Sequence, residues 1–219
     1  MPRPSRVLAI AVTLLVTPLV ADAQTCLGLA PFSAGRVQLA AGASFGNDSK
    51  AFDAGLTFGS TTGPFAGVSV GTTSYDEFDG NTTTVGAQFG WQAPIGTDNR
   101  IQLCPGVGAV YGFGPDNIEG SGTDLSSWGA FFGLQLGFSM GSNPQFRVVP
   151  TVGAALAYSK LELEGGFFGG LEEDDTFGIF TLGLGLILNT RVSILPSVDI
   201  PVGLEDADPA FGVMLGVNF

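Results

Sequence analysis

Four arginines recur at similar places in this sequence, and a guanidinium group can bind an anion through forked, charged hydrogen bonds. Each stands at the start of one of four related stretches, GRVQLAAGASFG, NRIQLCPGVGAVYG, QFRVVPTVGAALAYS and TRVSILPSVDIPVG; the arginines are Arg36, Arg100, Arg147 and Arg191. If these stretches are strands of one barrel, the arginines form a partial ring inside one mouth, and such a ring can favour anions. The favoured alternative is that they bond to turn carbonyls or mark the inner membrane–water boundary.

Asp53 and Asp199 are the two acids that fall on the same small-residue face as these arginines. Two carboxylates can do acid–base chemistry where they meet, but serving as partners for arginine is the favoured role. The sequence contains no histidine, so a serine or cysteine nucleophile would lack its usual base near neutral pH. We therefore expect no enzyme, no catalytic residue, no metal site and no cofactor.

Cys26 and Cys104 are the chain's two cysteines. In an oxidising compartment such a pair favours a disulfide, although two free thiols remain the alternative. A bond between them would draw the segment from Gln24 to Ser33 toward the mouth that Cys104 faces. It could narrow or plug that opening.

The first residues have the composition of a secretory signal. Arg3 and Arg6 precede an apolar run from Val7 to Val20, and the A-x-A site Ala21–Ala23 follows. A short membrane anchor is the alternative, but a helix needs about 20 residues to cross a bilayer. The expected organisation is a signal peptide over 1–23, a periplasmic N-terminal segment over 24–34 and a membrane-spanning barrel over 35–219.

The rest of the chain alternates large apolar and small residues, which is the period of a β-strand. We count ten such segments after Gly35, and the strongest has Trp128, Ala130, Phe132, Leu134, Leu136 and Phe138 on one face. Short and long connections separate them in turn. This pattern predicts an all-β, closed, antiparallel up-and-down barrel of about ten strands, with eight as the alternative.

The direction of the large-residue face decides between a membrane barrel and a lipocalin-like soluble barrel. Only 13% of the residues are charged, 34 are glycine, and the small-residue face carries mostly Gly, Ser, Thr, Gln and Ala. A face so poor in charge is unusual next to bulk water. We therefore expect the large face against lipid, the small face around a narrow lumen, and the longer, acidic connections outside the cell.

Three prolines lie inside predicted strands, where each removes an amide that a closed sheet needs. They are Pro105, Pro150 and Pro196. We expect β-bulges at these positions near the periplasmic rim.

The last strand alternates Phe211, Val213, Leu215, Val217 and the terminal Phe219 with smaller residues. That ending, with the PxVGA-type stretches Pro105–Ala109 and Pro150–Ala154, resembles the small bacterial outer-membrane barrels, the OmpA-like and OmpX-like "porin family". The resemblance covers essentially the whole mature chain. It implies export through the periplasm into the outer membrane of a Gram-negative-type envelope, contact with outer-membrane lipid, and recognition of the C-terminal signal by the barrel assembly machinery.

Acidic residues gather in the longer connections and give the chain a net charge of −12, which makes nucleic-acid binding improbable. Carboxylate oxygens at this density could hold divalent cations, but a solvated, mutually repelling surface is the favoured interpretation. The first expectation for function is a structural or surface-interaction barrel. The alternative is a passive narrow pore for small solutes with an Arg-lined periplasmic mouth.

Overall fold

The computed structural model describes residues 26, 29–30, 37–60, 62–75, 80–96, 100–114, 123–140, 145–165, 171–204 and 207–219. The expected signal peptide (1–23) and Arg36 lie outside these residues. Among the described residues, no helix has both the length and the apolar composition needed to cross a bilayer.

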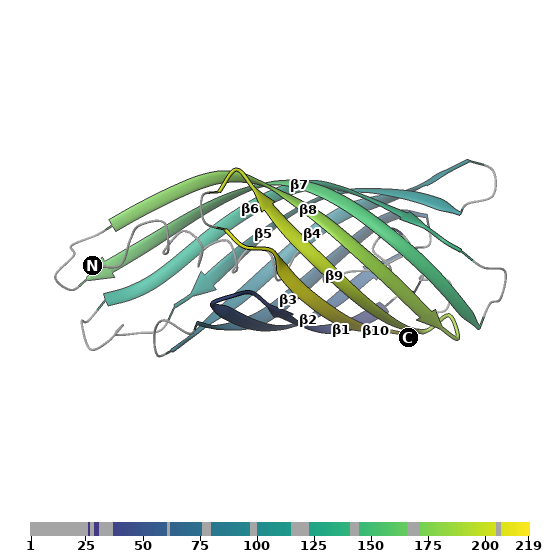
Figure 1. Ribbon diagram of the computed structural model, residues 1–219, viewed down its shortest axis with the longest axis horizontal. Coiled ribbons are helices and arrows are strands. Elements are labelled where there is room, and N and C mark those ends of the chain that lie inside the picture. The colour runs from purple at the N-terminus through teal and green to yellow at the C-terminus, as the bar shows by residue number, and fades with distance from the viewer. Residues whose placement is uncertain are drawn as a thin grey trace.

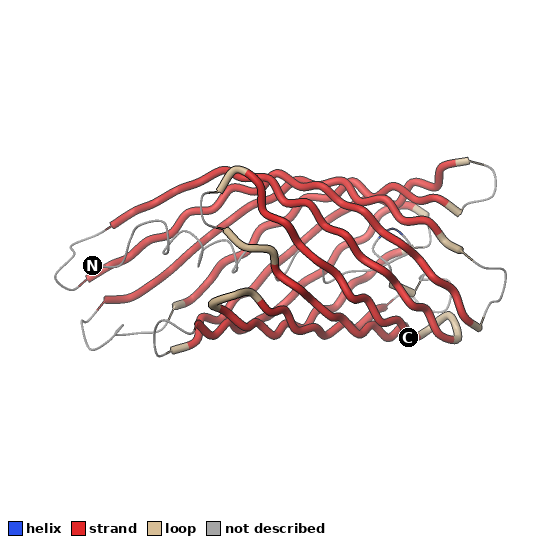
Figure 2. The backbone as a smooth tube through the Cα atoms, viewed as in Figure 1, coloured by secondary structure: helices blue, strands red, loops and turns tan. Residues whose placement is uncertain are grey.

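The described chain forms a closed barrel of ten antiparallel strands, as the alternation predicts (Figure 1). The strands are β1 (Val37–Phe45), β2 (Ser49–Gly59), β3 (Gly63–Tyr75), β4 (Asn81–Ile95), β5 (Ile101–Phe113), β6 (Thr123–Phe138), β7 (Phe146–Gly165), β8 (Leu171–Leu188), β9 (Val192–Val202) and β10 (Ala210–Asn218). Each pairs with its neighbours in sequence, and β1 pairs with β10 to close the sheet. The strands cross the long axis of the barrel at a marked tilt (Figure 2).

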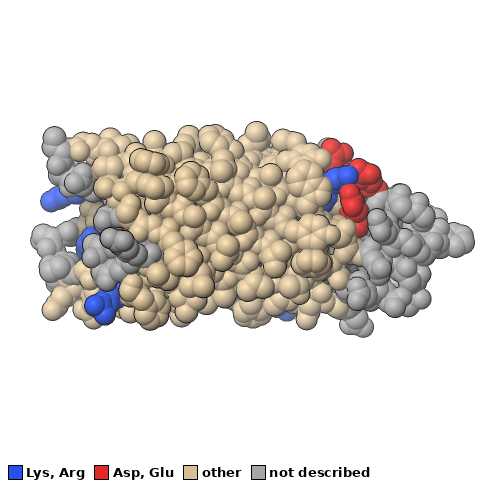
Figure 3. Space-filling view, turned by 180° about the vertical axis from the view of Figure 1, so that it is seen from behind, with Lys and Arg blue, Asp and Glu red and all other residues tan. Residues whose placement is uncertain are grey.

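The large apolar residues face outward, as the charge pattern predicts. Exposed outward-facing side chains occur on every strand and include Leu39, Phe52, Val70, Phe89, Val107, Phe132, Leu156, Leu182, Ile200 and Leu215. Their neighbours in sequence point into the lumen and are buried or half-buried. Charged side chains of the described residues gather at the two ends, and the broad middle of the visible surface carries almost none (Figure 3). An uncharged apolar belt of this kind matches the hydrocarbon core of a membrane.

Strand length differs around the barrel. β1 and β10 have nine residues each, close to the 9–11 that a tilted strand needs to cross a bilayer. β7 has 20 residues and β8 has 18. The pairing of β8 with β9 begins at Gly178, so the preceding residues of β8 pair with β7 alone. β6 pairs with β7 as far as Gly165, so the β7–β8 hairpin projects beyond β9 while β6 runs alongside it.

The end opposite this hairpin carries the short connections and the C-terminus. The tightest connection joins β8 to β9 through Asn189 and Thr190, which have φ values of 52° and 60°. Two successive positive φ values are typical of the turns that match the twist of a β-hairpin. We call this the short-turn end and the opposite one the hairpin end; in outer-membrane barrels the short turns lie on the periplasmic side.

The expectation of β-bulges at the prolines is wrong, because no strand gains an extra residue there. The β4–β5 ladder stops at Gly90–Gly106 and resumes at Ala93–Leu103, beside Pro105. The β8–β9 ladder skips the same number of residues on both strands beside Pro196. Since proline lacks an amide hydrogen, the ladder is interrupted without a shift in register. Pro150 faces Leu184 within continuous β7–β8 pairing.

Candidate functional site: the lumen

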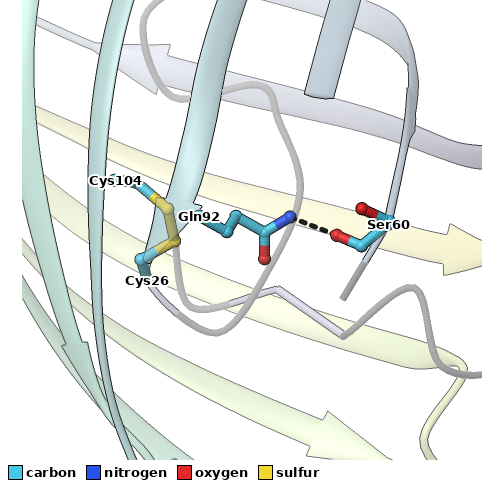
Figure 4. Close-up of a disulfide and its surroundings, with 4 residues drawn as sticks. All are labelled: Cys26, Ser60, Gln92 and Cys104. Atoms are coloured by element: carbon cyan, nitrogen blue, oxygen red, sulfur yellow. Dashed lines mark hydrogen bonds between the residues drawn. A yellow bond between two sulfur atoms is a disulfide. The ribbon is translucent and has the colours of Figure 1, made fainter. Parts of the chain in front are cut away.

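Cys26 and Cys104 are joined by a disulfide whose Cα atoms lie 6.1 Å apart (Figure 4). Cys104 points inward from β5, so the bond fixes Cys26 inside the lumen, where both cysteines pack with Phe65 of β3. Beside the disulfide, Gln92 Nε2 donates a hydrogen bond to the Ser60 carbonyl at 2.6 Å.

Leu29 and Ala30 continue this inner segment and are fully buried. Leu29 packs with Ala40, Leu195 and Met214, on strands β1, β9 and β10. Ala30 packs with Val149 of β7 and Ile187 of β8. With Cys26 held near β3 and β5, three residues of one short segment reach three different parts of the wall.

The backbone of Ala30 is also hydrogen-bonded to the wall. Its carbonyl accepts from Gln38 Nε2 at 3.2 Å and from Asn218 Nδ2 at 3.0 Å. Gln38 Nε2 also donates to Asn218 Oδ1 at 2.6 Å, across the β1–β10 seam. We call the residues Cys26, Leu29 and Ala30 the inner plug, because together they occupy the lumen near the end with the short turns.

A second obstruction lies nearer the hairpin end. Val110, Ala157, Phe177 and Ile179, from strands β5, β7 and β8, form a buried apolar cluster inside the barrel. Phe131 of β6 and Leu204, from the connection after β9, pack against it. That connection is tied across the rim by a hydrogen bond from Asn47 to Asp208. We call these six residues the upper cluster.

A small cavity of about 70 Å³ lies along the inner wall, with lining residues from the neighbourhoods of both obstructions. Gln88, Gln135 and Thr181 give it polar groups, and Phe65, Phe131 and Ile179 give it apolar ones. A water molecule occupies about 30 Å³ in the liquid, so the cavity has room for only a few waters.

The arginines are spread around the rim at the short-turn end. Arg100, Arg147 and Arg191 stand at or just before the starts of β5, β7 and β9. Arg100 and Arg191 are exposed, and Arg147 is half-buried. Arg147 Nε is buried without a hydrogen-bond partner among the described residues. The partial ring of arginines stays a prediction, and its fourth member, Arg36, lies outside the described residues.

The two luminal aspartates are not paired with each other. Asp199 is buried and accepts a 2.5 Å hydrogen bond from the Thr181 hydroxyl. Asp53 has Oδ2 buried without a partner among the described residues. Across the β1–β10 seam, Asp53 is level with Met214 through Gly42, whereas Asp199 is level with Ala210. This four-residue offset argues against a shared acid–base site, and no three Cys, Asp or Glu side chains of the described residues form a metal-binding group.

The projecting hairpin carries a charged group outside the membrane belt. Lys160 Nζ lies 2.8 Å from Glu162 Oε1 and 2.5 Å from Glu172 Oε1. Hydrogen bonds to Glu162 and then Glu172 hold the pKa of Lys160 well above its usual range. Just below, the rings of Trp128 and Tyr158 are 5.1 Å apart, in the position of an interfacial aromatic pair.

The C-terminal residues of the expected assembly signal line the outer face of β10. Phe211, Val213, Leu215 and Phe219 are exposed. The Phe219 amide donates to the Val37 carbonyl at 2.9 Å, which continues the β1–β10 pairing to the last residue.

The sequence predicts a lumen lined by small and polar residues, and that prediction does not include the upper cluster. Two places in the sequence do carry a signal for it, because large apolar residues are adjacent in Phe131–Phe132 and Ile179–Phe180. In a strand, neighbours point to opposite faces. One member of each pair must therefore enter the lumen.

This geometry defines a closed β-barrel with a lipid-type outer face and an obstructed lumen. No protein-family model matches the sequence, and no curated protein matches it. Among solved structures, it is similar to the transport unit of the autotransporter AIDA-I from Escherichia coli, with a TM-score of 0.53 and 13% identity over 100% of this chain and 99% of that one.

Two further structures have lower scores. The translocator domain of the autotransporter NalP from Neisseria meningitidis has a TM-score of 0.47 and 11% identity over 98% of this chain and 96% of that one. The N-terminal β-barrel domain of Pseudomonas aeruginosa OprF has a TM-score of 0.42 and 16% identity over 84% of this chain and 96% of that one. At this level of identity, the AIDA-I comparison shows a common barrel fold and nothing about activity.

Proposed function

We propose that this protein is an integral outer-membrane barrel with a structural or surface-interaction role, exported through the periplasm. Its outer face supports the membrane location. Large apolar side chains of all ten strands point outward, and burying them in hydrocarbon removes the cost of exposing them to water. The closed sheet satisfies the backbone hydrogen bonds that lipid cannot.

The obstructed lumen is the observation that carries the proposed role. A pore needs a continuous aqueous path, and the inner plug and the upper cluster place buried apolar groups in the lumen at two separate levels. The cavity lined by Phe65, Phe131 and Ile179 has a volume of about 70 Å³. The passive narrow pore therefore has less support, because both obstructions would have to move.

The cell-surface end gives the proposed role its contact area. The β7–β8 hairpin projects beyond the neighbouring strand β9 and presents Lys160, Glu162, Glu172 and Asp174. A rigid paired hairpin holds these charges away from the membrane, where they can meet soluble partners. The sequence also suggests three kinds of partner, which remain proposals. They are outer-membrane lipid, the barrel assembly machinery and divalent cations at the acidic connections.

A non-enzymatic role belongs to the same proposal. The chain has no histidine, and Asp53 and Asp199 stand four residues apart in register across the seam. The Thr181 hydroxyl donates a hydrogen bond to Asp199, but the sequence has no histidine to act as the usual base for such a hydroxyl.

Single-channel recording of purified, refolded protein in a planar bilayer tests the role. We expect insertion that protects the barrel from protease but gives no steady conductance at moderate voltage. A steady ohmic current from the intact oxidised protein would reject the obstructed-lumen role and favour the pore.

A further inference from the structure

We propose that the inner plug is held in a hydrophilic vestibule by the Cys26–Cys104 disulfide, and that breaking this bond opens the vestibule to the periplasm. The inference rests on the proposed function to the extent that both place this end of the barrel in the periplasm. It goes further by assigning the disulfide the role of a lock.

The wall around the plug combines apolar side chains that pack against it with polar groups that bind water well. Five buried side chains near this end have a polar oxygen without a hydrogen-bond partner among the described residues: Gln38, Thr57, Gln92, Gln102 and Thr151. Arg147 Nε is also buried without a hydrogen-bond partner among the described residues. A permanent core normally satisfies its polar groups. This wall instead matches a surface that water would occupy once the plug leaves.

The described residues of the plug make few polar contacts with the wall. Of its three described residues, only Leu29 has a large apolar side chain, and Ala30 contributes two hydrogen bonds through one carbonyl. Leaving polar groups buried and unpaired opposes this attachment. Among the contacts of the described plug residues, the disulfide to β5 is the covalent one.

The disulfide joins residues 78 positions apart and anchors the plug to β5, a strand that is paired on both sides. The ten strands pair with one another without help from residues 26–30. Loss of the bond should thus free the segment while the barrel stays closed. The upper cluster, formed by strands β5 to β8 and Leu204, should also remain.

The test uses one reporter cysteine in the vestibule. Thr57 is fully buried and faces Gln38, the residue that holds Ala30. Thr57→Cys is made in the oxidised wild-type chain and in the Cys26→Ser/Cys104→Ser chain. Each protein is folded in micelles and treated with a small charged methanethiosulfonate reagent. We expect labelling of the reporter to be at least about tenfold faster without the disulfide, as for a site whose local opening has become easier.

Ala157→Cys is the matched control, because Ala157 lies inside the upper cluster. Its labelling should stay slow in both backgrounds, while heat-modifiable gel migration shows that the barrel is folded. Equal slow labelling of Cys at 57 in both backgrounds would overturn the proposal. So would equal acceleration at 157, because that result would mean general loosening of the barrel.

A second measurement applies if the serine variant does not fold. The folded, oxidised protein carrying Thr57→Cys is treated with dithiothreitol, whose two thiols become a disulfide while Cys26 and Cys104 each gain an electron and a proton. Mass spectrometry then follows labelling at 57 separately from the two released thiols. Faster labelling at 57 after reduction supports the lock, and an unchanged rate overturns it. Conductance of the oxidised protein tests the obstructed-lumen role independently of either labelling result.

Discussion

Phe131 of β6 lies directly opposite Gly108 of β5, and its ring occupies the space that a side chain at Gly108 would need. The same relationship joins Phe65 of β3 to Gly90 of β4. Both rings point into the lumen. Glycine on the facing strand is what gives a large ring room inside a narrow barrel.

Gly108→Ala should destabilise the barrel by about 1–3 kcal/mol, the usual cost of overpacking a well-filled interior. A Cβ at this position would overlap the Phe131 ring and approach the Ala87 carbonyl oxygen to 2.9 Å. The free energy of unfolding is measured from urea titration of the refolded protein in micelles.

Gly106→Ala is the control on the same strand. The nearest atom to its added Cβ would be the Phe89 carbonyl oxygen at 3.6 Å, an ordinary contact. The change should be close to neutral, since alanine also restricts the unfolded chain. Equal effects at 106 and 108 would show that glycine's backbone freedom matters here and that room for the Phe131 ring does not.

Leu182→Arg tests whether lipid covers the outer face. Leu182 is exposed and pairs with Val152 and Val198, near the middle of the belt. Arginine near the midplane should cost about 2–4 kcal/mol, whereas Phe58→Arg, close to the periplasmic rim, should cost about 0–1 kcal/mol. Unfolding is followed in phosphatidylcholine vesicles. Equal costs at the two depths would argue against a membrane belt.

The outer face and strand number could be predicted from the sequence because a strand's side chains alternate strictly. Rows such as Leu182, Leu184 and Leu186 need no knowledge of their neighbours to be placed on one face. The direction of that face follows from charge, since its partner row carries too few ionised groups to meet bulk water.

The filling of the lumen could not be predicted in the same way. The contacts of Phe177 and Leu29 depend on which strands lie across the lumen from them. The alternation of side chains along a strand does not predict contacts across a barrel. The prediction of β-bulges at the prolines was wrong for a related reason. The missing amide of Pro196 suggested an extra residue in the strand, but the ladder simply omits the bonds on both sides.

Two obstructions in series make a specific prediction for conductance. Phe177→Ala removes a ring from the upper cluster, and Cys26→Ser/Cys104→Ser releases the inner plug. Neither change alone should give steady openings in a planar bilayer, because the other obstruction remains. The combined variant should conduct. Steady openings after one change alone would mean that the remaining obstruction does not seal the lumen.

Lys160 should be unusually hard to acylate at alkaline pH, because only the neutral amine reacts and its pKa is raised by hydrogen bonds to Glu162 and Glu172. A raised pKa in the folded state means that the ion pairs contribute at neutral pH and are lost as pH rises through the raised value. Glu162→Gln and Glu172→Gln should each shift the pH midpoint of acylation downward, toward that of an ordinary lysine. Mass spectrometry resolves Lys160 from Lys50, the chain's other lysine, which reports the reagent concentration in every sample. A midpoint for Lys160 that neither substitution moves would show that the two carboxylates do not hold its proton in the membrane-inserted protein.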